Sequence, residues 1–298
     1  MQLALTILMD GLIYASWLFV VALGLTLVFG VLKILNIAHG SLYAVGAYVA
    51  ASAVTLASAW GFGGSFALVA MLLAAIGVAL VVGPVLERGL LRLFYGRDEV
   101  VLLLVTYALF LILEDGVKLI WGVNPYYVSE PYQLFGNVAM GQLFYVGYDF
   151  ALIGLAIVCG LAVWFGLNRT VSGKIVLAVI FSREMSASMG VNVDRVHMVA
   201  FTIGVFLAAL GGAFTAPMIS VQPGISVSVI IVSFAVIIIG GLGSIEGAAI
   251  GAVIVGLARA AAVHLMPEAE LFSIYLVMAA VLIFRPEGLF QRAAARKI

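Results

Sequence analysis

Charged residues are scarce in this sequence. Of its 298 residues, 9% are Asp, Glu, Lys or Arg, and 65% are hydrophobic. A soluble domain of average composition has about 25% charged and about 45–50% apolar residues. A soluble fold of this length would lack the charged side chains needed at its surface, so much of the apolar surface must face lipid. We therefore expect an all-α, polytopic integral membrane helix bundle, with room for about 8–9 transmembrane helices.

Several chemical signatures are also missing. The formal net charge is zero, so no basic field points to nucleic acid. Cys159 is the only cysteine and cannot form an intrachain disulfide. The only Gly-Lys pair, Gly173-Lys174, lacks the flanks of a Walker A motif, and no Gly-x-Ser-x-Gly sequence is present. The three histidines show no metal-ligand spacing. We expect no catalytic residue, metal or cofactor in this chain.

Apolar runs separated by polar breaks predict nine helices. They cover residues 8–31, 40–59, 64–83, 99–120, 148–166, 196–219, 226–243, 246–264 and 270–284. Residues 36–40 lie where the first helix gives way to the second, and this stretch could instead be a broken or re-entrant segment. Eight full spans with one partial element is therefore an open alternative.

Lysine and arginine are distributed unevenly between the loops that these helices define. With nine crossings, twelve of the 14 basic residues fall on one side of the membrane, and only Lys118 and Arg259 lie toward the other. The positive-inside rule assigns the crowded side to the cytoplasm. Residues 1–298 are thus expected to form a single transmembrane domain with its N-terminus outside and its C-terminus inside. An external loop would cover 121–147, and a cytoplasmic segment 167–195.

The external loop is rich in tyrosine. Its residues 133–145 alternate loosely around two glycines, which is typical of a short hairpin. The aromatic residues would form either an interfacial belt or a docking surface for an external partner.

The cytoplasmic segment contains signals for a short helix at 182–190. Ser182 can cap its first turn, which contains the acidic residue Glu184, and Gly190 can end it. Small residues in between would let another protein approach closely: Ser186, Ala187 and Ser188. The alternative is an ordinary amphipathic helix lying on the bilayer.

Two polar or small-residue patterns interrupt the apolar runs. Asn36, His39, Gly40 and Ser41 mark a helix end, whose unpaired backbone groups a membrane tolerates only inside protein or along a wet cavity. This break is either an element of a translocation pathway or gate, or a structural cap or hinge. A second pattern spaces glycines four residues apart, which predicts close helix packing within this chain or against a partner: Gly243, Gly247 and Gly251.

Ionisable residues are rare inside the predicted helices, which disfavours coupling to protons or sodium. Glu114 and Lys118, spaced i,i+4, are expected to pair near the outer end of the fourth helix. Arg259 is expected to extend its side chain outward to the interface. With so few buried charges, the chain should provide passage more than tight recognition, because holding a zwitterion requires charges or aligned helix ends.

Four stretches together resemble one family. The segment around 182–190 is similar to the coupling loop of ABC importer permeases, in which a short Glu-Ala-Ala-like helix ending before a glycine sits in a cleft of the ATPase. Three other stretches resemble the permeases of high-affinity branched-chain amino acid (Liv-type) importers: 24–40 with Gly46-Ala47-Tyr48, 240–247, and the Phe284-Arg-Pro-Glu-Gly-Leu-Phe290 end. Their order and spacing agree over essentially the whole chain, and the likeness is closer to the first, shorter partner of the permease pair.

Two departures from the family pattern indicate a divergent branch. Residues 175–177 are Ile-Val-Leu where members usually carry further basic residues, and Glu246 stands where proline is common. Relatives of this family resemble importers of urea, short amides and aromatic acids, so the substrate could be one of these or a branched-chain amino acid.

The resemblance implies a permease subunit of an ATP-driven importer in the plasma (inner) membrane of a prokaryotic-type cell. It implies a second homologous permease, two ABC ATPases that bind ATP and Mg, and an external solute-binding protein that determines specificity. Contacts to the ATPase would come from Ser182, Arg183, Glu184, Ser186, Ala187 and Gly190. The competing class is a stand-alone secondary transporter or channel.

Overall fold

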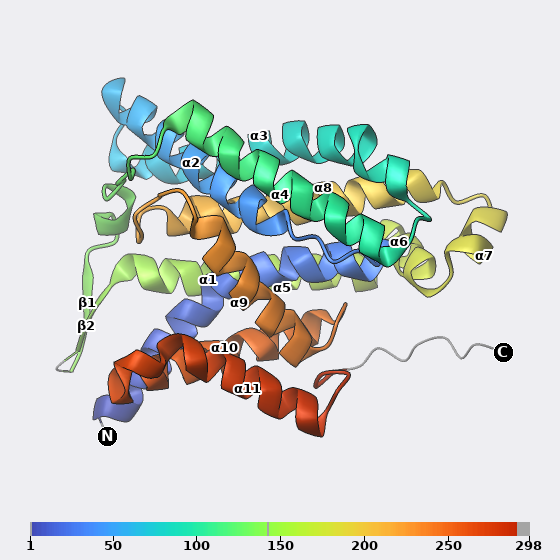
Figure 1. Cartoon of the computed structure of the whole chain (residues 1–298). Helices are drawn as coiled ribbons and strands as arrows, with labels where there is room; N and C mark the ends of the chain where they lie inside the picture. The colour runs from blue at the N-terminus through green and yellow to red at the C-terminus, as the bar shows by residue number, and fades with distance from the viewer. Residues whose placement is uncertain (1, 142, 291–298) are drawn as a thin grey trace.

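The computed structural model describes residues 2–141 and 143–290 as a bundle of helices with one small hairpin (Figure 1). The helices are α1 (Gln2–Leu32), α2 (His39–Ala59), α3 (Gly64–Gly89), α4 (Glu99–Trp121), α5 (Gly147–Arg169), α6 (Val171–Phe181), α7 (Arg183–Ser188), α8 (Val193–Thr215), α9 (Ile225–Gly240), α10 (Ile245–Leu265) and α11 (Glu270–Phe284). Short 3-10 turns occur at Leu91–Phe94, Pro131–Gln133 and Pro267–Ala269, and the strands are β1 (Asn137–Met140) and β2 (Leu143–Val146).

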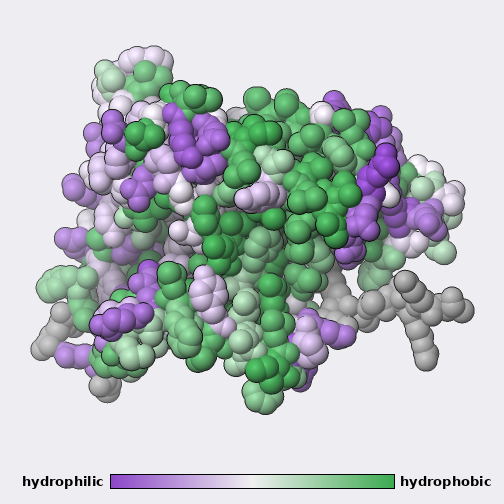
Figure 2. All heavy atoms as spheres, viewed as in Figure 1, coloured by the Kyte–Doolittle hydropathy of each residue, from purple (hydrophilic) through white to green (hydrophobic). Residues whose placement is uncertain are grey.

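The bundle has two distinct ends. The hairpin and the start of α1 lie at one, here called the hairpin end, and α7 projects from the other, here called the α7 end (Figure 1). Five helices run from the hairpin end toward the α7 end (α1, α3, α5, α9 and α11), and four run back (α2, α4, α8 and α10). Hydrophobic residues form a broad middle band, with hydrophilic residues gathered toward both ends (Figure 2). This pattern is that of a multi-pass membrane protein.

Each of the nine predicted helices corresponds to a helix in the structure. Among the described residues, eight helices are long and apolar enough to cross a membrane. One of the eight is α11 together with the 3-10 turn before it, Pro267–Phe284. The ninth helix, which falls short of this length, is α9 with 16 residues, and not the helix that begins near His39. The sequence analysis missed α6, whose 11 residues include the apolar stretch 175–181. The predicted hairpin is confirmed as an antiparallel pair in which Asn137 faces Val146.

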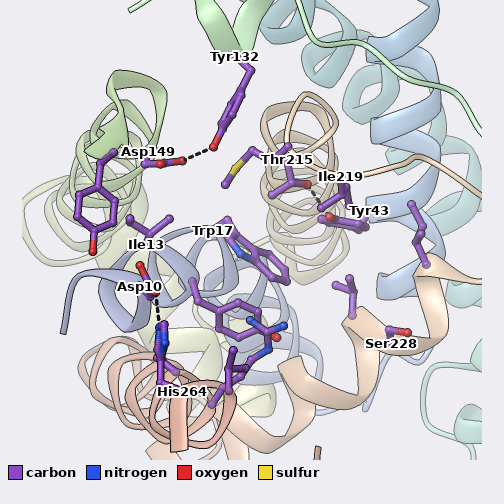
Figure 3. A pocket seen from close by; sticks show the side chains of 18 residues that line it. Asp10, Ile13, Trp17, Tyr43, Tyr132, Asp149, Thr215, Ile219, Ser228 and His264 are labelled. Carbon is purple, nitrogen blue, oxygen red and sulfur yellow. Dashed lines mark hydrogen bonds and ion pairs between the residues drawn. The ribbon is translucent and has the colours of Figure 1, made fainter. Parts of the chain in front are cut away.

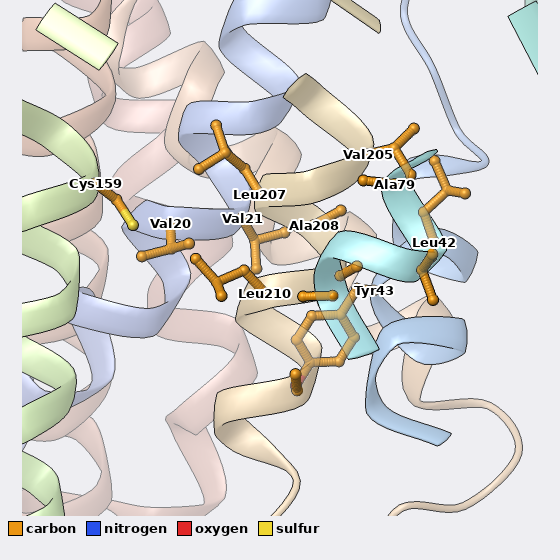
Figure 4. Packing of buried hydrophobic residues seen from close by; sticks show 14 of the residues in the cluster. Val20, Val21, Leu42, Tyr43, Ala79, Cys159, Val205, Leu207, Ala208 and Leu210 are labelled. Carbon is orange, nitrogen blue, oxygen red and sulfur yellow. The ribbon is translucent and has the colours of Figure 1, made fainter. Parts of the chain in front are cut away.

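The core surrounds α1, which packs against α5, α6, α8, α9 and α10. Its main hydrophobic cluster joins α1, α2, α3, α5 and α8 around residues such as Val21, Tyr43 and Leu207 (Figure 4). Small residues let these helices approach closely, because a Cβ on Gly46 would overlap the Ala209 backbone of α8. In lipid, such close packing replaces the hydrophobic driving force that folds soluble proteins.

The glycine stripe packs α10 against α9 of the same chain. A Cβ on Gly247 would overlap the carbonyl oxygen of Gly240, and one on Gly251 would overlap that of Val236. Helix packing is therefore confirmed for these two glycines. Gly243 lies in the turn before α10 with φ +83°, where a residue without a side chain is favoured, and a Cβ on it would lie 3.4 Å from the Cα atom of Gly30 in α1.

Candidate functional site

The polar break predicted at residues 36–41 is a re-entrant connection. After α1 ends at Leu32, the chain turns back along the bundle, and α2 begins at His39 (Figure 1). The His39 Nε2 atom lies 3.0 Å from the carbonyl oxygen of Val21. From Val21, α1 continues for eleven residues to its end at Leu32, with a rise of about 1.5 Å per residue. The start of α2 thus lies roughly 16 Å back along the axis of α1 from Leu32.

Side chains and carbonyl groups of α4 form hydrogen bonds with the polar groups of this irregular segment. The Thr106 hydroxyl donates to the carbonyl oxygen of Leu35 at 3.2 Å and accepts from the backbone N–H of Ile37 at 3.4 Å. The Ser41 hydroxyl donates to the carbonyl oxygen of Phe110 at 3.1 Å. These contacts replace hydrogen bonds that water cannot supply in a membrane interior.

The four residues predicted as a pathway or gate are enclosed by the chain's own helices. Asn36 is 1% exposed and His39 is fully buried. Both side-chain amide atoms of Asn36 and the Nδ1 atom of His39 have no hydrogen-bond partner among the described residues. A Cβ on Gly40 would overlap the carbonyl oxygen of Ser226 at the start of α9. A role in translocation stays a prediction for these residues.

A polar cavity opens close to this break, toward the hairpin end. Its volume is about 540 Å³, and α1, α2, α5, α8, α9 and α10 all contribute to its wall. The side chains in Figure 3 combine charged groups with aromatic and aliphatic surface. The charged residues in the wall are Asp10, Asp149, Arg259 and His264.

Two ion pairs join the helices around this cavity. The His264 Nε2 atom of α10 lies 2.6 Å from an Asp10 carboxylate oxygen of α1 (Figure 3). The Arg259 guanidinium pairs with Glu270 of α11 and lies 4.2 Å from the ring centroid of Tyr14. A carboxylate and an aromatic face thus hold the Arg259 side chain, which is 31% exposed, and its extension to the interface stays a prediction.

A further carboxylate, Asp149, lies at the start of α5 and is 6% exposed. It accepts a hydrogen bond from the Tyr132 hydroxyl at 3.3 Å and has no basic partner in an ion pair among the described residues. Burial, and then the nearby charge of Asp149, raise the pKa of Tyr132 to about 12. Tyr132 thus stays protonated and donates at neutral pH.

The cavity ends on a floor of aromatic residues. The Trp17 ring lies 6.2 Å from the Tyr43 ring, and the Tyr43 hydroxyl lies 2.5 Å from the Thr215 hydroxyl at the end of α8. Tyr43 follows His39 by four residues on α2, so the two lie one helical turn apart on the same face. His39, one of the predicted gate residues, therefore lies one helical turn from the cavity floor.

Glu114 holds the start of α9, which contributes to the same wall. Its carboxylate accepts from the Gly224 backbone N–H at 2.7 Å and from the Ser226 hydroxyl. An anion at a helix N-terminus meets unpaired N–H groups and the positive end of the helix dipole. The predicted pair of Glu114 with Lys118 was wrong, because Lys118 instead contacts Asp115 at 3.0 Å.

The short helix predicted in the segment 182–190 is present as α7 at the opposite end. The Ser182 hydroxyl caps it by accepting from the Met185 N–H at 3.3 Å, Glu184 lies in its first turn, and Gly190 follows with φ +85°. Ser186 is not part of its outer face, because it is buried and donates to the Ser182 carbonyl oxygen. The outer face instead presents Met185 and Met189, at 69% and 82% exposed.

Contacts between α3, the connection that follows it and α8 form the base from which α7 projects. Arg92 pairs with Asp194 at 2.5 Å, which ties the connection after α3 to the first turn of α8. The Tyr95 ring packs edge-on against His197 at 5.0 Å, and its hydroxyl donates to Glu87 at 3.1 Å. Flexible, exposed side chains on such an anchored helix suit a contact with another protein.

Sequence reasoning missed the cavity as a site, because its residues come from elements far apart in the chain. One local signal was available in α1, where Asp10, Tyr14 and Trp17 are spaced i, i+4 and i+7 and share one helix face. A polar and aromatic face on an otherwise apolar helix indicates an inward-facing wall. The partners of that face cannot be identified from spacing alone.

Three comparisons with known proteins show what this chain is similar to. A family model described as "Branched-chain amino acid transport system / permease component" matches residues 7–284. The chain is 28% identical to the high-affinity branched-chain amino acid transport system permease protein BraD of Pseudomonas aeruginosa, over 98% of this chain and 97% of that protein. It is 26% identical to the corresponding permease protein LivH of Escherichia coli, over 97% and 96% of the two chains. A solved structure, PsaBC from Streptococcus pneumoniae in complex with Fab, is 14% identical with a TM-score of 0.47, over 92% and 89% of the chains.

Proposed function

The chain belongs to the family of permease components of branched-chain amino acid transport systems, and on that premise we propose that it is a permease subunit of an ATP-binding-cassette importer. It forms the translocation pathway together with a second, homologous permease. Its solutes are branched-chain amino acids or related small polar molecules. Two ATPase subunits supply the energy, and an external binding protein delivers the solute.

The proposed orientation places the α7 end in the cytoplasm of a prokaryotic-type cell and the hairpin end outside its inner membrane. Basic residues concentrate toward α7 and the loops beside it, among them Arg88, Arg92, Arg183 and Arg195. The positive-inside rule supports this direction. The polar cavity then opens on the side from which solute arrives.

The observation that carries the proposal is the form of α7. It is a separate helix of six residues between α6 and α8, fixed at both ends by Ser182 and Gly190. Met185 and Met189 project from it without cover in this chain. A short, anchored helix with exposed apolar side chains is suited to insert into a cleft of another protein and to transmit its movement.

Variants of α7 test this role in the assembled transporter. Gly190→Val forces a β-branched residue into a left-handed backbone conformation at a cost of about 1–2 kcal/mol, and Glu184→Arg reverses a charge in the first turn. We expect both to insert normally and to lose at least about tenfold in ATP-dependent uptake, with ATPase subunits lost on purification or hydrolysing ATP without uptake.

A matched control is Arg97→Ala, which removes an exposed charge at the same end of the bundle but outside α7. It should co-purify with the ATPases and support normal uptake. Normal uptake by both α7 variants would contradict the coupling role. Uptake that needs no ATPase at all would point instead to a stand-alone transporter or channel.

A further inference from the structure

The cavity at the hairpin end offers three kinds of surface to a solute. Carboxylates of Asp10 and Asp149 lie toward one side of it (Figure 3), and the Arg259 guanidinium lines it from α10. Aromatic and aliphatic groups, with Trp17 and Ile13 among them, form the remaining wall. At about 540 Å³ the cavity lies in the size range of small-molecule sites.

The negative groups in this region outnumber the positive ones. Three carboxylates, those of Asp10, Asp149 and Glu270, lie in or beside the wall, together with the Arg259 guanidinium and the His264 imidazole. The ion pairs join Asp10 to His264 and Glu270 to Arg259, whereas Asp149 has hydrogen bonds from the Tyr132 hydroxyl and the Val146 backbone but no ion pair among the described residues. A buried carboxylate without a cation is costly, so an ammonium group arriving as part of a solute would be stabilised there.

Arg259 retains capacity for an anion. A guanidinium carries five N–H donors in a planar fork, and the contact with Glu270 involves one of its terminal nitrogen atoms. Its packing against the Tyr14 ring holds the plane of the group while leaving other donors available. A carboxylate at this position would make charge-assisted hydrogen bonds.

We infer that this cavity, within a single permease chain, binds an α-amino acid with an apolar side chain in its zwitterionic form. The ammonium group faces Asp10 and Asp149, the carboxylate faces Arg259, and the side chain lies on Trp17 and Ile13. This inference rests on the proposed function and narrows its solute class. Urea and simple amides carry neither charge, and aromatic acids lack the ammonium group, so none of them would use both sets of residues.

Binding at this site is weak. Asp10 and Arg259 already have partners inside the protein, so a solute must compete with His264 and Glu270 for them. A site along a conduction route has to release its solute as readily as it takes it up. The inference thus agrees with the expectation that tight recognition lies outside this chain.

Trp17 supplies a direct readout, because it is the tryptophan among the residues that line the cavity. Replacing the other three, as Trp60→Phe, Trp121→Phe and Trp164→Phe, leaves Trp17 as the sole indole in the full chain. We would titrate this variant in lipid nanodiscs with three solutes. Leucine carries both an ammonium group and a carboxylate, leucinamide carries only the ammonium group, and 4-methylpentanoate carries only the carboxylate. The expected result is a saturable change in Trp17 emission with leucine, at least about tenfold weaker with either analogue.

Two further substitutions separate binding from a structural role. Asp149→Asn, which keeps the bond from Tyr132, should weaken leucine about tenfold and leave 4-methylpentanoate unchanged. Arg259→Gln should weaken leucine similarly and leave leucinamide unchanged. Asp115→Asn removes a carboxylate at the same end outside the cavity and should change none of the three titrations.

Two outcomes would overturn the inference. One is the absence of a saturable emission change with all three solutes, and the other is equal weakening of every solute by both variants, which would show that the charges only hold the helices together. ATP-dependent uptake by the assembled transporter is measured separately. Uptake of leucine without any Trp17 response would reject this site and keep the proposed function, whereas a Trp17 response without ATP-dependent uptake would reject the function and keep the site.

Discussion

The two ends of the bundle use their charged residues differently. At the hairpin end, Asp10, Glu114 and Arg259 turn inward and find partners on other helices. At the α7 end, Arg183 and Glu184 are exposed on a helix that projects from the bundle (Figure 1). Inward charges create a pocket for something small, whereas outward charges on a projecting helix offer a surface to something large. The contrast is the arrangement that a solute-handling end and a partner-handling end require.

The exception at the α7 end supports the same distinction. Arg92 and Asp194 pair across two elements, yet both side chains are largely open to solvent. Such a pair contributes about 0–1 kcal/mol and mainly fixes geometry. It positions α7 and does not enclose a cavity of the size found at the hairpin end.

The sharpest way to break the comparison is to show that both ends face the same compartment. On a Cys159→Ser background, Ser129→Cys at the hairpin end and Ser188→Cys on α7 place equivalent exposed thiols at the two ends. A membrane-impermeant maleimide added to spheroplasts should label position 129 and spare 188, and permeabilised cells should show both. Ser186 is a poor reporter because it is buried. Labelling of 188 but not 129 would reverse the proposed orientation, and equal labelling in spheroplasts would abolish the distinction.

Much of the fold could be predicted because hydropathy and helix caps are local signals. Runs of apolar residues locate all nine long helices, and Ser182 with Gly190 marks α7 within a residue or two. The same local logic failed for α6, whose apolar stretch is too short to distinguish from a loop that lies on the membrane. The spacing of the glycines also does not show that Gly243 lies in the turn before α10 and approaches Gly30 of α1, whereas Gly247 and Gly251 face α9.

The candidate site was harder to predict because side-chain direction depends on tertiary packing. Glu114 has a nearby lysine that suggests an i,i+4 pair, but it instead contacts the start of α9, 110 residues further along the chain. Arg259 pairs with Glu270 in the next helix, α11, which its own position in α10 does not indicate. For Glu114, the unpaired N–H groups of α9 attract the carboxylate more strongly than an exposed lysine does. No pattern within α4 indicates where the start of α9 will lie.

Replacing Glu114 should lower the stability of the protein more than replacing Thr106, the other residue tested within the membrane. Glu114→Ala removes the acceptor for the Gly224 N–H and the Ser226 hydroxyl, and each buried donor left without a partner costs about 1–3 kcal/mol. Glu114→Gln retains one acceptor oxygen and should lose less. Thermal unfolding of the purified protein measures both, with Asp115→Ala on the same helix as a control that should stay within about 0.5 kcal/mol of wild type. If Glu114→Ala behaved like the control, inward charge at the hairpin end would have no structural value, and the contrast between the ends would lose its physical basis.

The smallest expected effect concerns the re-entrant connection that lies between the two ends. Thr106→Val preserves the shape of the side chain but removes the hydroxyl that serves the Leu35 carbonyl and the Ile37 N–H. If the connection is dry, the loss should cost about 1–2 kcal/mol in unfolding experiments, and Thr106→Ser should recover most of it. Thr55→Val, which removes only a hydrogen bond to Ala51 within α2, should have a smaller effect. Water could replace the hydroxyl if the segment lined a wet pathway, and then Thr106→Val would unfold like wild type. A destabilised Thr106→Val therefore identifies Asn36–Ser41 as a structural hinge, whereas an unaffected variant identifies the same residues as part of the route that joins the cavity to the α7 end.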